Sequence, residues 1–95
     1  MRDSGVSVVV TCYNYGEYVA GCLTSVLDQT YKDFEIVVVD DGSTDDSASQ
    51  IASVRDGRIR YVRQENAGQA VAKNRGVRES TREFIAFLDA DDRWT

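Results

Sequence analysis

The chain has 95 residues, of which 42% are hydrophobic and 28% are charged, and its formal net charge is −5. This length is enough for one domain, and the composition is that of a globular protein rather than a disordered one. The acidic balance argues against nucleic acid or an anionic membrane as the main partner, because both are bound by basic surfaces.

The residue types present narrow the chemistry further. The chain contains no histidine, which excludes a Ser-His-Asp triad, so any metal must be a hard cation held by oxygen. Cys12 and Cys22 lack CxxC spacing and a disulfide-rich context, which predicts free thiols in a reducing compartment. No apolar run approaches the roughly 20 residues that cross a bilayer, and the N-terminus lacks a signal-peptide pattern. We expect a cytoplasmic protein, with peripheral attachment to the inner membrane face as an alternative for a longer protein.

The first half of the chain predicts two buried strands, each followed by a helix. Val6–Thr11 and Phe34–Asp40 are apolar without alternation, which is typical of strands that are covered on both faces. The helix between them carries apolar residues at four-residue spacing: Tyr18, Cys22 and Val26, and beside them Val19, Leu23 and Leu27. A second helix, capped by Ser43 or Thr44, follows the turn at Gly42 and carries Ala48, Ile51 and Ala52.

The second half predicts two further strands around a third helix. Arg58–Gln64 alternates basic and apolar residues, as a less buried edge strand does, and a helix is expected from about Gly68 to Ser80. Phe84–Asp89 is apolar on both faces, which predicts a helix on each side. Because no helix follows it, we expect the natural protein to continue beyond Thr95. The order β-α-β-α-β-α-β predicts an α/β fold with a mostly parallel, Rossmann-like sheet.

Acidic residues collect at the carboxyl ends of the second and fourth predicted strands. These residues are Asp40 and Asp41, and then Asp89, Asp91 and Asp92. Ligands of parallel α/β sheets bind beyond these strand ends, near the point where the strand order reverses. Like charges about 4 Å apart repel by roughly 1–4 kcal/mol, so a divalent cation is expected among them. Carboxylates without histidine or cysteine favour Mg²⁺ or Mn²⁺, which are usually shared with a ligand phosphate.

Three stretches carry a resemblance to a known family. They are SVVVTCYNYGEYVAGCLTSVLDQTYKDFEIVVVDDGSTDDS, then ENAGQAVAKNRG, then FIAFLDADD. In this order they resemble the nucleotide-binding half of glycosyltransferase family 2, which has the GT-A fold, and together they are more specific than a lone DxD. The resemblance implies transfer of a sugar from a nucleoside diphosphate to a hydroxyl acceptor, with inversion. Residues 1–95 would then be the N-terminal, donor-binding portion of a GT-A domain.

The resemblance also implies roles for individual residues. Thr11 and Tyr13 would line the base and ribose pocket, with Tyr13 stacking on the base. Asp41 would accept a hydrogen bond from the base edge, and Asp40 would support its loop. The segment beside the nucleotide would be Asn66, Gly68, Lys73 and Asn74, with Lys73 reaching the base or a phosphate.

Asp89 and Asp91 form the DxD pair of the resemblance. Asp89 would lie near the ribose or donor, and both would bind Mn²⁺ or Mg²⁺. The implied donor is a UDP-sugar, and the acceptor is a glycan or another hydroxyl compound. The general base of the family lies downstream of the DxD, so the resemblance implies no catalytic residue within this chain, which alone would be inactive.

Less specific interpretations exist for each motif. Asp40–Ser43 alone is typical of a turn, and Asp89–Asp92 alone could be a solvated helix start. Their joint position at neighbouring strand ends favours a site. The alternative functions are a non-catalytic module that binds nucleotide sugars and a haloacid-dehalogenase-type phosphatase, whose DxD motif begins the domain instead of ending it. The exposed last strand further predicts self-association of this chain.

Overall fold

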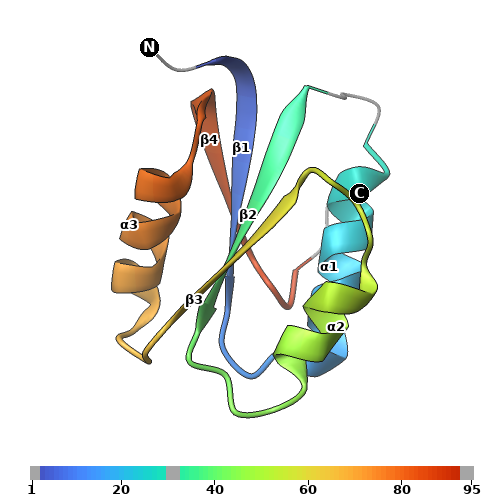
Figure 1. Ribbon diagram of the computed structural model, residues 1–95, viewed down its shortest axis with the longest axis vertical. Helices are drawn as coiled ribbons and strands as arrows, with labels where there is room; N and C mark the ends of the chain where they lie inside the picture. Colours follow the sequence, from blue (N-terminus) through green and yellow to red (C-terminus); the bar gives the residue numbers. More distant parts are fainter. Residues whose placement is uncertain (1–2, 30–32, 93–95) are drawn as a thin grey trace.

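The computed structural model describes residues 3–29 and 33–92. Four parallel strands form one sheet in the order β3-β2-β1-β4, with three helices packed against it (Figure 1). The strands are β1 (Asp3–Cys12), β2 (Phe34–Asp41), β3 (Ile59–Gln64) and β4 (Arg82–Asp89), and the helices are α1 (Gly16–Leu27), α2 (Ser47–Ser53) and α3 (Gln69–Glu79). The predicted parallel α/β fold is confirmed.

The sheet lies between two helical layers. Helices α1 and α2 cover one face, and α3 covers the other (Figure 1). None of the helices in the described part of the chain is long and apolar enough to span a membrane. The larger core packs β1 and β2 against α1 and includes Val8, Val10, Ile36, Val38, Val19, Leu23 and Val26, whereas Val37, Val39 and Ala72 form the core under α3. All of β2 is buried, as its apolar run without alternation predicted.

The two edge strands both agree with the expectations from the sequence. β3 is an edge strand, as its alternation indicated. β4 forms the other edge, where Phe84 is 62% and Phe87 is 49% exposed, in agreement with the expectation of an exposed last strand. Phe87 lies on the face of the sheet that α3 covers, but α3 packs mainly over β1 and β2, and Phe84 lies on the opposite face.

Two local predictions about the helices are wrong. Tyr18 does not join the buried stripe of α1; it is 50% exposed and contacts Tyr15 edge to face, with ring centroids 6.4 Å apart. Helix α2 begins at Ser47, too far along the chain for Ser43 or Thr44 to cap it. Instead, the Asp45 carboxylate accepts hydrogen bonds from both the backbone N–H and the hydroxyl of Ser47.

A buried carboxylate ties the amino ends of the strands together. Glu35 on β2 accepts hydrogen bonds from the hydroxyl of Ser7 (2.6 Å) and from the backbone N–H of Thr81 (2.7 Å). The Arg60 guanidinium lies 3.6 Å away. Burial alone would raise the pKa of Glu35, but these partners outweigh it and hold the pKa below its ordinary value of 4.5. This end of the sheet is therefore closed by internal contacts.

The strand order leaves a crevice at the opposite end. From β1 the chain passes through α1 to β2 on one side, and it later returns through α3 to β4 on the other side. The order therefore reverses between β1 and β4, and parallel α/β sheets bind ligands at such a point. In the strand register, Thr11 is paired with Asp89 and Cys12 with Asp40, so the predicted strand-end residues lie side by side.

Candidate functional site

A cavity of about 330 Å³ opens at the carboxyl ends of the central strands. Its lining includes most of the predicted site residues, namely Thr11, Tyr13, Asp41, Asn66, Gly68, Asp89 and Asp91, together with Cys12, Tyr15, Gln69 and Ala72, which sequence reasoning missed. Lys73 and Asn74 lie outside this lining. The ammonium group of Lys73 lies 5.9 Å from the centre of the Phe87 ring on the edge strand β4.

Three carboxylates meet at the end of β4. Asp89, Asp91 and Asp92 each place one oxygen so that all three lie within 4.8 Å of one another. A tight turn brings them together: the N–H of Ala90 donates to the Thr11 carbonyl at 3.0 Å, and the N–H of Asp92 donates to the Asp89 carbonyl at 2.9 Å. A donor set of carboxylate oxygens fits a hard divalent cation such as Mg²⁺ or Mn²⁺.

Asp41 holds the loop that forms one wall of the cavity. Asp41 is only 4% exposed, and each of its two carboxylate oxygens accepts two hydrogen bonds. The donors are the side chains of Gln64 (2.8 Å) and Asn66 (3.2 Å) and the backbone N–H groups of Ala67 (2.8 Å) and Gly68 (3.0 Å). This carboxylate therefore fixes the segment between β3 and α3 against the end of β2.

The turn after Asp41 requires glycine. Gly42 has a φ of +74°, and a Cβ added there would lie 2.7 Å from the backbone nitrogen of Asn66. A side chain would thus push away the segment that Asp41 holds. Gly42 was expected to form a turn, but the close approach of two chain segments is visible only in the fold.

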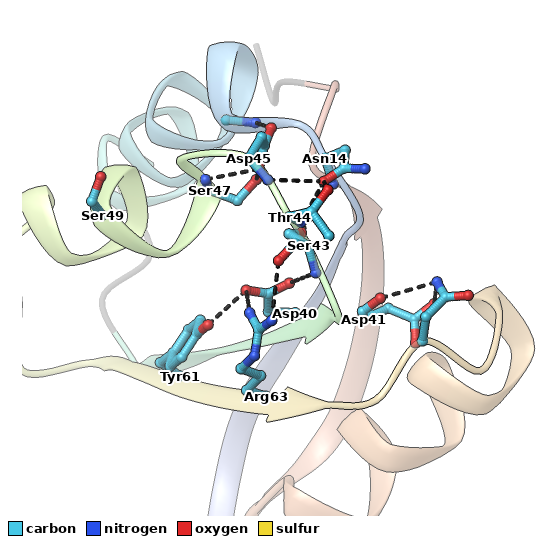
Figure 2. Close-up of polar contacts among 12 residues, drawn as sticks. Asn14, Asp40, Asp41, Ser43, Thr44, Asp45, Ser47, Ser49, Tyr61 and Arg63 are labelled. Atoms are coloured by element: carbon cyan, nitrogen blue, oxygen red, sulfur yellow. Dashed lines mark hydrogen bonds and ion pairs between the residues drawn. The ribbon is translucent and has the colours of Figure 1, made fainter.

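Asp40 is fully buried and is the centre of a second polar network (Figure 2). It accepts hydrogen bonds from the backbone N–H of Ser43 (2.9 Å), the hydroxyl of Tyr61 (2.6 Å) and the guanidinium of Arg63 (3.1 Å). Burial alone would raise the pKa of Asp40, but these donors outweigh it and hold the pKa below its ordinary value. Arg63 also donates to the Ser43 carbonyl at 3.1 Å, which connects β3 to the loop after β2.

Asn14 joins the loop after β1 to the loop after β2 (Figure 2). Its side-chain oxygen accepts hydrogen bonds from the N–H groups of Thr44 (2.8 Å) and Asp45 (3.3 Å), while its own N–H donates to the Ser43 hydroxyl at 2.9 Å. Its φ of 56° lies in the left-handed region, where asparagine is the favoured residue after glycine. Asn14 thereby sets the course of the chain directly after Tyr13, which is 46% exposed at the cavity.

The cysteine in the cavity wall does not act as a nucleophile. Burial raises the pKa of the Cys12 thiol above its ordinary value of 9.0, so the thiol stays protonated at neutral pH. Cys22 lies behind it, and its thiol donates to the Asp89 carbonyl at 3.7 Å. Neither cysteine forms a disulfide, as predicted, and both are buried.

Acidification is expected to destabilise the fold through Asp40 and Glu35. The folded-state pKa values of Asp40 and Glu35 lie below the ordinary pKa values of 3.8 and 4.5. Each carboxylate therefore makes its full contribution to stability when the pH is above its ordinary pKa. The contribution is lost as the pH falls through the folded-state pKa. The free energy of unfolding, measured in urea from about pH 6 to about pH 2.5, should therefore decline below about pH 4.5. Glu35→Gln should make this decline shallower, and an unchanged slope in that variant would contradict the assignment.

The sequence and the fold both place this chain in one family. Residues 7–95 match the family model described as "Glycosyl transferase family 2". The chain therefore belongs to glycosyltransferase family 2, and this decides against the phosphatase alternative.

The chain is 45% identical over 94 residues to an uncharacterized glycosyltransferase of Rickettsia felis, covering 97% of this chain and 15% of that protein. It is also 45% identical over 92 residues to the glycosyltransferase GlyA of Streptococcus pneumoniae, covering 95% and 13%. The chain thus spans only a small part of each relative.

Solved structures have the same fold. TarS from S. aureus, crystallised in complex with UDP-GlcNAc, superposes with a TM-score of 0.87 at 31% identity, covering 93% of this chain and 27% of that one. The mannosyltransferase PcManGT from Pyrobaculum calidifontis, in complex with GDP-Man and Mn²⁺, gives a TM-score of 0.86 at 29% identity, covering 99% and 32%. The expected GT-A fold is confirmed for this part of the chain.

Proposed function

We propose that this chain is the donor-binding portion of an inverting, metal-dependent glycosyltransferase whose donor is a UDP-sugar. The observation that carries the proposal is the cavity between the ends of β1, β2 and β4, with three carboxylates gathered at its edge. The complexes of TarS with UDP-GlcNAc and of PcManGT with GDP-Man and Mn²⁺ support a nucleotide sugar and a divalent cation as ligands. The two free, buried cysteines fit a reducing compartment, and we place the protein in the cytoplasm.

The nucleoside occupies the part of the cavity next to Tyr13 in this proposal. Tyr13 is half-exposed at the end of β1 and can stack on the base, while Thr11 lies deeper between the base and Asp89. Asp41 acts on the base edge directly or through the Asn66–Gly68 segment that it holds. Lys73 and Asn74 lie one turn further along α3, and Lys73 reaches the donor only if it leaves the Phe87 ring.

Asp89 and Asp91 would hold Mn²⁺ or Mg²⁺, with Asp92 beside them. When bound, the cation stabilises negative charge on the departing nucleoside diphosphate as a Lewis acid. In this proposal Asp89 and Asp91 bind the cation and thereby orient the donor, because their anionic oxygens lie on the side of the cavity that the phosphates would occupy. We place the general base and the acceptor-binding residues outside these 95 residues, so the chain alone should bind a donor without transferring its sugar.

A thermal-shift experiment tests the proposal and identifies the base. UDP, GDP and dTDP are each added with and without Mn²⁺ to the wild type and to Asp91→Ala. A ligand at about ten times its dissociation constant adds roughly 1.4 kcal/mol of stability, which for a chain of this size raises Tm by roughly 6–11 °C. We expect such a rise for UDP with Mn²⁺ and its loss in Asp91→Ala.

Asp28→Ala provides the matched control for this experiment. Asp28 is an exposed aspartate at the end of α1, remote from the cavity, so the variant should respond as the wild type does. A rise without Mn²⁺ dependence, or one that survives in Asp91→Ala, would contradict the metal assignment. A lack of response to every nucleotide would contradict donor binding by this chain.

A further inference from the structure

Gln69 contacts the first carboxylate of the DxD pair. Its side-chain amide donates a hydrogen bond to Oδ1 of Asp89 at 2.7 Å. The Thr11 hydroxyl donates to the same oxygen at 3.3 Å, which is a weaker contact. Both of these side-chain hydrogen bonds thus end on Oδ1, on the side of Asp89 that faces β1 and α3. The other oxygen, Oδ2, accepts neither of these two hydrogen bonds.

Gln69 also connects two strand ends that are not neighbours in the sheet. It is the first residue of α3 and follows Gly68, whose N–H donates to Asp41 at the end of β2. Since β1 lies between β2 and β4, Asp41 and Asp89 have no direct strand pairing. The start of α3 therefore bridges the cavity, with Asp41 holding its backbone and Gln69 holding Asp89.

We propose that Gln69 is a positioning residue of the donor site, an inference that rests on the proposed function. By fixing Oδ1, it holds the Asp89 carboxylate in one orientation, with Oδ2 available to the cation and the donor. A carboxylate next to two others would otherwise rotate, and its ordering would oppose binding. Residues that orient metal ligands through a hydrogen bond strongly affect metal affinity. Gln69 is exposed and is not part of the buried core, so its replacement should change the orientation of Asp89 without changing the packing of the core.

The chain offers a matched control. Gln50 on α2 makes the same type of contact: its side-chain amide donates to Oδ2 of Asp46 at 3.1 Å, and neither residue lines the cavity. Gln69→Met and Gln50→Met both remove an amide donor from a carboxylate and keep a side chain of similar length. Because both pairs lie at the surface, we expect the Tm of the ligand-free protein to change little in either variant.

Isothermal titration calorimetry of UDP tests the inference, using the 95-residue chain in Mn²⁺ and again in EDTA. Gln69→Met should bind UDP about tenfold more weakly than the wild type in Mn²⁺ and with unchanged affinity in EDTA. Gln50→Met should match the wild type in both conditions. A residue with a merely structural role, or one that contacts the nucleotide itself, would weaken binding equally in Mn²⁺ and EDTA, and that result would overturn the inference.

The remaining outcomes separate this inference from the proposed function. If the wild type binds UDP with Mn²⁺ dependence and Gln69→Met binds it equally well, the positioning role is wrong and the donor site stands. If the wild type shows no Mn²⁺-dependent UDP binding, the proposed function itself is wrong, and the role of Gln69 falls with it.

Discussion

Replacing Asp40 by alanine is expected to lower the free energy of unfolding by about 3 kcal/mol. The carboxylate is fully buried and accepts hydrogen bonds from Ser43, Tyr61 and Arg63. Removing it leaves the N–H of Ser43, a buried residue, without its acceptor, and a buried donor that has lost its partner keeps the full cost of its desolvation. Urea unfolding followed by circular dichroism measures the change.

The control for this variant is an aspartate with the same kind of partner at the surface. Asp56 pairs with Arg58 at 2.9 Å, and solvent screens that pair. Asp56→Ala should therefore destabilise the fold much less than Asp40→Ala does. Equal losses in the two variants would show that the Asp40 network does not stabilise the loop after β2.

Replacing Gly76 by leucine is expected to lower the free energy of unfolding by about 3 kcal/mol as well, through steric conflict. A Cβ at this position would lie 2.3 Å from Cγ1 of Val9, a fully buried residue in the central strand β1. The Val9 side chain is β-branched and fully buried, so it cannot rotate aside easily, and α3 must shift away from the sheet. Because α3 begins at Gln69, the shift also disturbs the cavity, and UDP binding should weaken together with stability.

A second glycine separates this conflict from the general effect of adding a side chain. A Cβ at Gly57 would meet no atom within 4 Å. Gly57→Leu should therefore change the free energy of unfolding by no more than about 0.5 kcal/mol, as surface substitutions do. If Gly76→Leu were equally mild, the close approach of α3 and β1 would not be a determinant of this fold.

The central strands and the place of the site could be predicted because their signals are local. The runs Val6–Thr11 and Phe34–Asp40 are continuous and β-branched, and the structure buries both at the centre of the sheet. A parallel sheet brings the carboxyl ends of its strands to one edge, which is why Asp41 of β2 and Asp89 of β4 line the same cavity, whereas Asp40 is buried in its own network. Binding roles for these residues remain predictions, since they concern a ligand.

The features that were missed depend on contacts between distant segments. In the sequence, Asn14 is only one polar residue in a predicted turn. Its role depends on the fold, which brings Thr44 and Asp45 into contact with its side chain. Gln69 has the pattern of a solvated helix residue, and its contact with Asp89 exists only because β4 ends close to the start of α3.

Paramagnetic NMR of the chain with UDP and Mn²⁺ tests the donor site most directly. Mn²⁺ broadens the amide signals nearest to it, so a titration of Mn²⁺ into the UDP complex locates the ion on the sheet. We expect the signals of Thr11, Asp89 and Asp91 to broaden first, while those of Ser7 and Glu35 at the opposite end of the strands persist. Broadening at that opposite end, or uniform broadening that does not depend on UDP, would contradict a metal–nucleotide site at the carboxyl ends of β1 and β4.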